Sequence, residues 1–409
     1  MKSKLTNFIA LDLGSSKIAA IGANIEKTGE AEITGQNLHY SDGIRSGIVT
    51  DLKQAEGSIL QAVYSLETEC NTNVNSAVIS LSSNGTKSYY VENTINIGGE
   101  KITSNDVKKL IQEALNNFKV PEYEVIHYFP IEFSLDDGNI VDDPIGMFGN
   151  ILECKLHIIA TNSNILLNLT NCLAKCQVEV TGVILSIYAA GMACLTEDER
   201  NLGALIIDFG ARTTSFGIFW GGKIIYTGHA PIGGWHITSD ISKAFSIKFA
   251  DAEKLKILYG NTGDSSMSSL SVNTVDDDYG QEITINSMDL ADIIRPRVQE
   301  ILDIVKEQYD KIGIDYLISR RIVLTGGGAM LKGLKGMVST CFYKQTRIGK
   351  PKIFYGFAED YNPGIYATSV GIIEAYVNRQ RKNYNPALDD YSTHQGFFQR
   401  ALAWFKANL

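Results

Sequence analysis

Residues 8–22 read FIALDLGSSKIAAIG, and residues 204–219 read ALIIDFGARTTSFGIF. Each stretch is an apolar run that ends in an aspartate, a glycine-containing turn with hydroxyl side chains, and a second run of small and apolar residues. This pattern predicts a β-hairpin whose tip carries an acid, a glycine and hydroxyl groups. A further strand is expected after each hairpin, at residues 32–38 and 223–228. The repetition therefore predicts two similar domains that face a cleft.

A third glycine cluster lies at residues 322–330, which read IVLTGGGAM. A strand leads into the three glycines, and a short helical run is expected behind them. Glycines let a backbone approach a flat ligand or a phosphate closely, and a helix N-terminus supplies free N–H groups. One such turn alone is most often a plain loop. Three of them in this order predict a triphosphate held between two hairpin tips, with the third loop against the adenosine.

The residue types in these turns suggest how each would contact a nucleotide. Backbone N–H groups of the first two turns would hold phosphate oxygens, and Lys17 would add a positive charge. Asp12 and Asp208 are acidic, so they would act through Mg²⁺ and its retained waters instead of touching phosphate. The turns supply Gly14, Ser15 and Ser16, then Gly210, Ala211, Arg212 and Thr213, and finally Gly326, Gly327, Gly328 and Ala329.

Residues 86–160 differ in character from the two repeated halves. A helix is expected at residues 105–118, with Thr103 or Ser104 as its N-cap and with apolar residues at helical spacing. Strand-like alternation surrounds it, so a small inserted α+β domain is predicted. The strands are expected at residues 88–96, 124–135 and 151–160.

In the second half, helices are expected at residues 238–259 and 290–311. The polar stretch between them, residues 263–281, is expected to be a loop. It contains three consecutive aspartates, which could suggest a Ca²⁺ site. A solvated loop is the preferred interpretation because the carboxylates lack the spacing of calcium ligands. The aspartates are Asp276, Asp277 and Asp278.

Length and composition limit the classes of protein to consider. A chain of 409 residues exceeds one compact core, so two or more domains are expected, and 44% hydrophobic with 20% charged residues is typical of globular proteins. The net charge of −9 disfavours a nucleic-acid binder. Six cysteines without C-x-x-C spacing indicate reduced thiols in a cytoplasmic protein. Neither a signal peptide nor a membrane-spanning run is recognised, so a cytosolic or peripheral protein is expected.

Residues 397–409 read FFQRALAWFKANL and follow a polar, helix-poor stretch. On a helix, the aromatic and apolar side chains gather on one face, and Arg400 and Lys406 flank it. The alternative is a C-terminal helix that docks on the protein's own core. The polar linker, the flanking cations and the aromatic-rich face favour a helix that lies in the interface of an anionic membrane. The expected membrane residues are Phe397, Phe398, Arg400, Leu402, Trp404, Phe405 and Lys406.

The three turns together resemble those of the actin/Hsp70/sugar-kinase superfamily. Residues 12–17 resemble its first phosphate loop, residues 208–214 its second, and residues 325–329 its adenosine loop. Residues 185–195 and 364–375, with small residues on apolar helices, resemble the two helices at its hinge. The resemblance implies bound ATP and Mg²⁺.

The resemblance also implies that Glu253 and Lys256 edge the ribose and the adenine, although a surface ion pair is the alternative. One departure lies in the second phosphate loop, where the superfamily usually has two or three glycines before a threonine. This chain has Ala211 and Arg212 there. The departure puts efficient hydrolysis in doubt, and no residue can be assigned to water activation. Nucleotide binding with at most weak ATPase activity is therefore expected, and the catalytic residues stay unassigned.

Over nearly the whole chain, the sequence resembles the FtsA family of bacterial cell-division proteins. The resemblance rests on VIHYFPIEF at residues 125–133, DPIGM at 143–147, SDGIRSGIV at 41–49 and the C-terminal tail. It implies an α/β, actin-like, two-lobed duplicated fold with an inserted α+β subdomain of the 1C type. The implied division is subdomain 1A at 1–85, 161–196 and 357–382, 1C at 86–160, 2A at 197–238 and 312–356, 2B at 239–311, a linker at 383–395 and the membrane helix at 396–409.

The family resemblance implies a protein that polymerises head to tail on the cytoplasmic face of the bacterial inner membrane and tethers FtsZ filaments at the division site. Expected partners are the C-terminal peptide of FtsZ, further copies of the chain, anionic membrane lipid and other division proteins, with no nucleic acid. Arg295 and Arg297 are candidates for pairing with peptide carboxylates, with surface ion pairs as the alternative.

Three other functions share this fold. A type IV pilus actin-like adaptor and a small-molecule kinase are the alternatives. The kinase has no use for an amphipathic tail, and the tail also argues against the pilus adaptor, which is the nearest structural competitor. A chaperone of the Hsp70 type would need a peptide-binding domain after the second lobe, and few residues follow it here.

Overall fold

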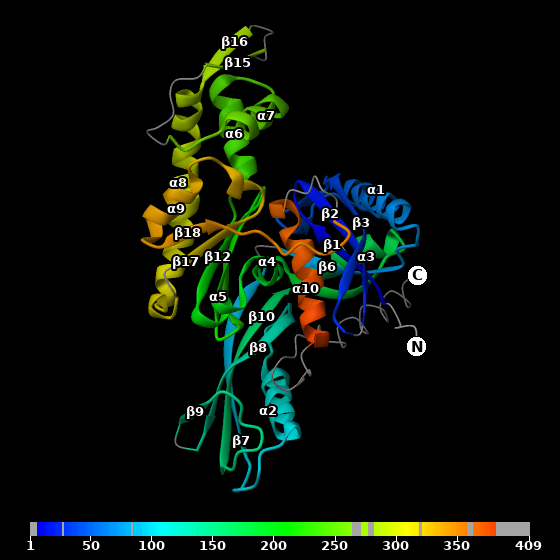
Figure 1. Cartoon of the computed structure of the whole chain (residues 1–409), viewed down its shortest axis with the longest axis vertical. Coiled ribbons are helices and arrows are strands. Elements are labelled where there is room, and N and C mark those ends of the chain that lie inside the picture. Colours follow the sequence, from blue (N-terminus) through cyan, green and yellow to red (C-terminus); the bar gives the residue numbers. More distant parts are fainter. Residues whose placement is uncertain are drawn as a thin grey trace.

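The computed structural model describes residues 6–26, 28–82, 85–136, 138–263, 271–276, 282–318, 321–357 and 363–381. The predicted linker and membrane helix therefore lie outside the described residues, as do Asp277 and Asp278. Two lobes, each built on a five-stranded sheet, lie side by side, and a third sheet extends from one end of the molecule (Figure 1).

Lobe 1 is built on a sheet with the strand order β11-β6-β1-β2-β3. Strands β1 and β2 form the first predicted hairpin, with Asp12 opposite Ala19, and β6 runs parallel to β1 on its other side. Helices α1 and α3 contribute buried apolar side chains to one core with these strands. The elements are β1 (Thr6–Leu13), β2 (Lys17–Ile25), β3 (Ala31–Tyr40), the short pair β4 (Ile44–Arg45) and β5 (Ile48–Val49), α1 (Leu52–Cys70), β6 (Ser76–Leu81), α3 (Ser163–Lys175) and β11 (Glu179–Leu185).

Lobe 2 repeats this arrangement, with the strand order β14-β13-β12-β17-β18. Strands β12 and β13 form the second predicted hairpin, with Asp208 opposite Ser215, and β17 runs parallel to β12. The two sheets therefore have the same pairing pattern, and the predicted duplication is present. The elements are α5 (Glu197–Leu202), β12 (Ala204–Phe209), β13 (Thr214–Trp220), β14 (Lys223–Ala230), η1 (Asp315–Leu317), β17 (Arg321–Thr325), η2 (Gly327–Met330), α9 (Leu334–Phe342) and β18 (Gln345–Ile348).

The insert, defined here as residues 86–160, leaves lobe 1 after β6 and forms a sheet of order β7-β10-β8-β9. Helix α2 is capped by Thr103, whose side chain and Asp106 form a capping box, as the N-cap prediction requires. Apolar residues of α2 and the three long strands share one core. The elements are β7 (Lys87–Asn96), α2 (Ser104–Asn117), β8 (Tyr123–Leu135), β9 (Asn139–Val141), which was not predicted, and β10 (Ile151–Asn162).

A second insertion, the α6–α8 segment, separates β14 from β17 and extends away from the insert (Figure 1). The single helix predicted at residues 238–259 is wrong, because the chain breaks at Ser246, whose φ of 53° cannot continue a helix. The loop predicted at residues 263–281 is also partly wrong, since it contains a strand that pairs with the next one. The elements are α6 (Gly234–Phe245), α7 (Phe249–Tyr259), β15 (Ser271–Asp276), β16 (Glu282–Asn286) and α8 (Ser287–Ile312).

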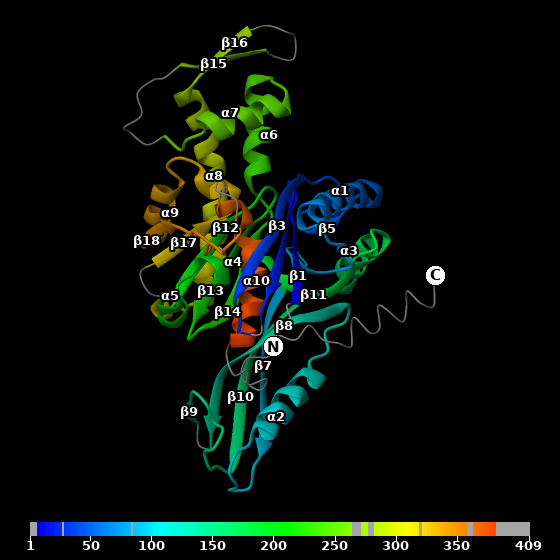
Figure 2. The same cartoon turned by 45° about the vertical axis from the view of Figure 1, so that its right-hand side comes forward.

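Helices α4 (Ser186–Cys194) and α10 (Ala367–Arg381) lie between the two sheets, as both views show (Figures 1 and 2). The short helix η3 (Pro363–Tyr366) precedes α10. The two helices approach so closely that a Cβ at Gly371 would lie 1.8 Å from the Ala189 carbonyl oxygen. They match the two segments predicted to form the hinge.

Two further expectations concern the chemistry of the whole chain. Within the described ranges, no helix is long and apolar enough to cross a membrane. The six cysteines are free, and four of them are buried: Cys154, Cys172, Cys176 and Cys194. Burial raises the pKa of the Cys154 thiol to about 12, so this group stays protonated and unreactive.

Candidate functional site

The two hairpin turns have the same backbone geometry. In the first, the Gly14 amide donates to the Lys17 carbonyl oxygen at 3.1 Å, and in the second the Gly210 amide donates to the Thr213 carbonyl oxygen at 3.0 Å. A Cβ added to either glycine would lie 2.7 Å from the same carbonyl oxygen. Glycine is therefore required at both turns, and the predicted pair of phosphate loops is equivalent in structure as well as in sequence.

Charged side chains of both lobes meet beside these turns. Burial raises the pKa of Asp12, and hydrogen bonding from Ser80, whose Oγ lies 2.6 Å from Asp12 Oδ1, opposes that rise. Burial and the neighbouring Asp12 carboxylate raise the pKa of Asp208 to about 6. Burial lowers the pKa of Lys17, and the attraction of the two carboxylates opposes that effect. The ammonium group of Lys17 and two carboxylates that come from different lobes are therefore close enough to shift one another's pKa.

The third glycine loop closes on the same charges. Gly326 has a φ of 84°, and a Cβ there would lie 2.1 Å from Asp208 Oδ1. Gly327 is exposed, and the nearest atom to a Cβ there would be Lys17 Nζ, at 4.0 Å. Gly328 packs against Phe209, and Ala329 is buried in the core of lobe 2. Of these four predicted residues, Gly327 leaves an open surface beside Lys17. The helical run expected behind the glycines begins as η2, and α9 starts only at Leu334.

The first predicted phosphate loop is held by the segment that follows β3. The Ser46 amide donates to Ser15 Oγ at 2.8 Å, and the Ser41 amide donates to the Ser16 carbonyl oxygen at 3.1 Å. The SDGIRSGIV motif therefore supports the first loop directly, a role that the sequence did not indicate.

The second predicted phosphate loop contacts the start of α6. The amides of Gly234 and Trp235 donate to the carbonyl oxygens of Gly210 and Ala211, at 2.9 and 2.6 Å. A Cβ at Gly233 would lie 2.5 Å from the Gly210 carbonyl oxygen, so the approach requires glycine. The guanidinium of Arg212 lies over the Trp235 ring, 4.0 Å from its centroid. Arg212 is thus fixed on an aromatic face at the tip of the loop.

Glu253 and Lys256 on α7 form an ion pair, with Lys256 Nζ 2.7 Å from Glu253 Oε2. Lys256 also donates to the Gly234 carbonyl oxygen at 3.1 Å and to Thr238 Oγ1 at 2.8 Å. Beyond α7, Asn261 pairs with Lys332 in a parallel bridge, which places this helix beside the third glycine loop. The pair thus connects α6, α7 and the second phosphate loop, and its contact with a nucleoside stays a prediction.

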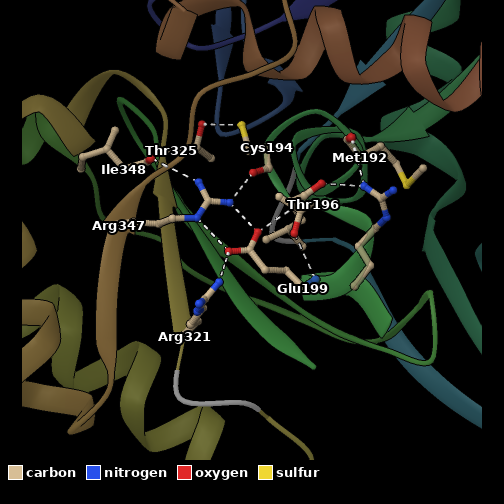
Figure 3. A network of polar contacts seen from close by, with 10 residues as sticks. Met192, Cys194, Thr196, Glu199, Arg321, Thr325, Arg347 and Ile348 are labelled. Atoms are coloured by element: carbon tan, nitrogen blue, oxygen red, sulfur yellow. Dashed lines mark hydrogen bonds and ion pairs between the residues drawn. The ribbon is translucent and has the colours of Figure 1, made fainter. Parts of the chain in front are cut away.

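Helix α4 is anchored to lobe 2 by a network around Glu199, which is buried (Figure 3). Arg347 donates from Nε to Glu199 Oε1 at 2.8 Å and from Nη2 to the Cys194 carbonyl oxygen at 2.7 Å, so it caps the end of α4. Cys194 Sγ lies 3.6 Å from Thr325 Oγ1, and Thr325 is the residue that precedes Gly326 in the third glycine loop. Helix α4 and the third glycine loop therefore share one polar network.

A second contact between the halves joins the insert to β14, the edge strand of lobe 2. His157 is fully buried, with Nδ1 2.8 Å from the Ile224 carbonyl oxygen and Nε2 3.0 Å from Ser88 Oγ. Tyr90 donates its hydroxyl to the Ile225 carbonyl oxygen at 2.7 Å. This contact uses the otherwise unpaired edge of β14, which protects that edge from other strands.

The two arginines predicted to bind a peptide lie on α8 in different surroundings. Arg297 pairs with Asp240 on α6, Nε to Oδ2 at 2.6 Å, and also with Glu300. Its guanidinium is therefore already engaged within the α6–α8 segment. Arg295 is exposed, with a nitrogen close to Gly263. Arg295 is thus the better placed of the two for a partner.

Several residues of the site escaped the sequence analysis. Ser80 lies one residue before the end of β6, in a strand without a distinctive motif, and only the parallel pairing of β6 with β1 brings it to Asp12. The Gly233–Gly234 pair before Trp235 was a signal of close backbone approach that could have been used. Thr238 was expected only as a helical residue, whereas its hydroxyl contacts both Lys256 and Glu253.

The residues present fit a nucleotide with a magnesium ion. Two carboxylates of different lobes could hold Mg²⁺ through its waters, since this ion prefers oxygen ligands and keeps part of its hydration. Within the described residues, no group of three or more His, Cys, Asp and Glu side chains is placed to hold a metal directly. Lys17 and the loop amides suit phosphate oxygens, and the bare surface of Gly327 suits a flat nucleoside.

Two equivalent sheets, the helices α4 and α10 between them and three glycine loops at their junction define an actin-like α/β protein. Solved structures agree on this fold. A PilM–PilN type IV pilus biogenesis complex superposes with a TM-score of 0.65 at 15% identity, over 92% of this chain and 99% of that chain. MreB 5 of Spiroplasma citri bound to AMPPNP gives 0.55 at 16% identity, over 92% and 98%. The predicted fold class is confirmed.

The chain belongs to the FtsA family of cell division proteins, as predicted. Residues 205–371 match the family Cell division protein FtsA, and residues 83–160 match the SHS2 domain inserted in FTSA. Residues 134–271 also match the Type IV pilus assembly protein PilM family. The chain is 30% identical to Cell division protein FtsA of Buchnera aphidicola over 410 residues, 97% of each chain. It is 27% identical to that of Escherichia coli K12 over 373 residues, 89% of each chain.

Proposed function

We propose that this division protein binds ATP with Mg²⁺ between its lobes, polymerises on the inner face of the cytoplasmic membrane and tethers FtsZ filaments there. The observation that carries the nucleotide part is the convergence of three glycine loops from two lobes on Lys17, Asp12 and Asp208. The solved MreB 5 structure, bound to AMPPNP, shares the fold and supports the proposal.

Gly327 provides the test of this proposal. A Cβ atom added there would have Lys17 Nζ, at 4.0 Å, as its only neighbour within 4 Å in the described part of the chain, and the residue is exposed. A leucine should therefore leave the fold intact while it fills the surface that a nucleoside needs. Gly336 on α9 is the matched control, because a Cβ there also meets no atom within 4 Å. Gly327→Leu should abolish binding of a fluorescent ATP analogue, and Gly336→Leu should not change it. Undiminished binding by Gly327→Leu would remove the assignment of the third loop.

Each group of the site has a role that its chemistry supports. The loop amides and Lys17 would hold phosphate oxygens, while Asp12 and Asp208 would hold Mg²⁺ through water. The ion, when bound, neutralises phosphate charge and orients the phosphates. The Ser80 hydroxyl, which donates a hydrogen bond to Asp12, would keep that carboxylate oriented. In the part of the chain that the structure describes, we assign no carboxylate to water activation, and the proposal is binding with at most weak hydrolysis.

The membrane part of the proposal rests on the tail sequence, residues 396–409. Removing these residues should release the protein from anionic vesicles without changing ATP binding. Trp404→Glu should do nearly the same, because it places a charge in the apolar face. Two tandem copies of residues 395–409 on a soluble fluorescent protein should sediment with vesicles, because linked copies gain avidity. A soluble tandem fusion beside a membrane-bound intact protein would show that the anchor lies elsewhere.

Self-association is proposed to use the insert. Its β9 and the loop that follows expose large apolar side chains, among them Ile140 and Phe148, which are 69% and 70% exposed. A head-to-tail contact between two different surfaces is open-ended and produces a filament. Replacing Ile140 and Phe148 by serine should prevent filaments on lipid and leave ATP binding intact. Persistence of filaments would place the contact on another surface.

Peptide binding is proposed for the α6–α8 segment, which exposes Ile257 and Met288 as well as Arg295. An exposed cation and exposed apolar side chains on the same segment suit an acidic, partly apolar peptide such as the C-terminal segment of FtsZ. Arg295→Glu should weaken peptide binding in a titration without changing stability. Arg297→Glu would instead place a third carboxylate beside Asp240 and Glu300 and should lower the melting temperature. Equal peptide affinities of wild type and Arg295→Glu would move the site to another face.

A further inference from the structure

The two phosphate loops share a backbone but differ in where they carry a cation. In the first loop, Lys17 is the third residue after Gly14. The residue at the same position of the second loop, the third after Gly210, is Thr213. The second loop has its cation one position earlier, at Arg212, where the first loop has Ser16. Since the backbones of the loops match, this difference lies in the side chains.

Arg212 is held in a defined position by its surroundings. Its guanidinium lies 4.0 Å from the centroid of the Trp235 ring, and the Trp235 amide donates to the carbonyl oxygen of the preceding Ala211 at 2.6 Å. The indole also packs against Phe249, at 5.5 Å between ring centroids. The Trp235 ring is therefore fixed to the loop, and it holds the Arg212 guanidinium in one orientation, ready to contact a ligand.

No ion-pair partner within 4.0 Å is found for Arg212 among the described residues, in contrast to Arg297 and Arg347. Burial and the like charge of Arg45 lower the pKa of Arg212. Arg45 belongs to lobe 1 and precedes Ser46, whose amide supports the first phosphate loop. Two guanidinium groups of opposite lobes thus stand near the phosphate loops, and an anion would relieve their repulsion.

We propose that Arg212, held over Trp235, contacts the terminal phosphate of a bound nucleoside triphosphate and makes the site prefer triphosphate to diphosphate. This inference rests on the proposed nucleotide binding. The loop amides and Lys17 would serve phosphates that both ligands share. A guanidinium offers several N–H donors in a plane and suits the third phosphate, which carries most of the additional charge of a triphosphate. Trp235 acts as a positioning residue.

The test measures the ratio of ATP to ADP affinity, each with Mg²⁺, by isothermal titration of the full chain. Arg212→Ala should lower ATP affinity about tenfold, since it removes a charge-assisted hydrogen bond, and should change ADP affinity less than about twofold. Arg212→Lys should restore part of the ratio because it keeps the charge but loses the planar donors. Arg321→Ala is the control, an exposed arginine of the same lobe that lies 3.9 Å from Glu199, outside the phosphate loops.

Variants of Trp235 test whether its ring positions Arg212 or only contributes to the stability of the fold. Trp235→Leu should lower the ATP preference about threefold at unchanged ADP affinity, and Trp235→Phe should restore most of it because the aromatic face returns. An Arg212→Ala protein that binds ATP and ADP in the wild-type ratio would overturn this inference and leave the proposed nucleotide binding standing. A wild-type protein that binds neither nucleotide would overturn both.

Discussion

The two halves of the molecule meet at two places that are built in opposite ways. At the predicted phosphate loops, the like charges of Asp12 and Asp208 come together beside the single opposite charge of Lys17, and burial shifts the pKa values of all three away from the ordinary range. Where the insert contacts β14, His157 and Tyr90 are neutral and hydrogen-bonded to backbone carbonyl oxygens. The first contact buries charged groups that repel one another, whereas the second contact buries neutral groups that are hydrogen-bonded.

This difference indicates which contact a ligand can change. Buried like charges destabilise the ligand-free protein, and a ligand that neutralises them gains that free energy back. A neutral, hydrogen-bonded contact gives a ligand nothing to relieve, so it is suited to hold the insert permanently. The two contacts should therefore respond with opposite sign to acid.

The largest effect is expected from the buried histidines. Burial and the neighbouring His157 lower the pKa of His127 to about 3, and burial lowers that of His157 to about 4. Each histidine binds a proton more readily in the unfolded protein, whose histidine pKa is near 6.5. Its contribution to the unfolding free energy is therefore complete above pH 6.5 and is lost as the pH falls below that value. The pair should cost about 4 kcal/mol of unfolding free energy between pH 7 and pH 5. Urea titrations of wild type and His157→Gln should differ in this pH dependence by about half that amount. Parallel curves would contradict the assignment.

The next effect concerns the anchor of the hinge helix, which lies between the two contacts. Arg347→Ala would leave the buried Glu199 without its main partner and should lower the unfolding free energy by about 3 kcal/mol. The double variant Arg347→Ala with Glu199→Gln should recover part of that loss, because the unpaired charge is gone. Urea denaturation at pH 7 measures both. A double variant less stable than the single one would exclude a penalty from a stranded charge.

A gain in stability is expected at the phosphate loops. The folded-state pKa of Asp208, about 6, lies above its ordinary value, so its ionised form destabilises the ligand-free protein at pH 7, and stability rises as pH falls from 6 towards 4. Asp208→Asn should stabilise the ligand-free protein by about 2 kcal/mol after allowance for solvent, while it loses Mg²⁺-dependent ATP binding. A variant that is less stable and binds normally would contradict the account.

The smallest effect is expected at the edge of the insert contact. Tyr90→Phe removes the hydrogen bond to the Ile225 carbonyl oxygen and should cost about 1 kcal/mol of unfolding free energy. ATP affinity should not change, because this contact is distinct from the phosphate loops. A loss of ATP affinity in this variant would show that the two contacts are coupled.

The repeated fold could be predicted because each hairpin combines an apolar strand, an acid and a glycine turn, and because such local patterns survive folding. The helix break at Ser246 could not, since a left-handed serine has no sequence signature. Strand β15 was missed because polar residues in a two-stranded ribbon lack the alternation of a half-buried strand.

The candidate site shows the same limit. The glycine loops could be predicted because they need glycine for steric reasons: a Cβ at Gly326, for example, would collide with Asp208. The Ser80 hydroxyl and the Trp235 platform depend on pairing between segments distant in sequence, and no local pattern marks them. The internal pairing of Arg297 with Asp240 depends likewise on how α6 and α8 pack together.

The central claim is that loops of both lobes hold one nucleotide. The most direct test is a structure of the full chain determined with ATP and Mg²⁺. We expect the phosphates to lie between the turns at Gly14 and Gly210, with Lys17 against them, and the nucleoside to lie on Gly327. A nucleotide that contacts one lobe alone, or that leaves Gly327 free, would contradict it.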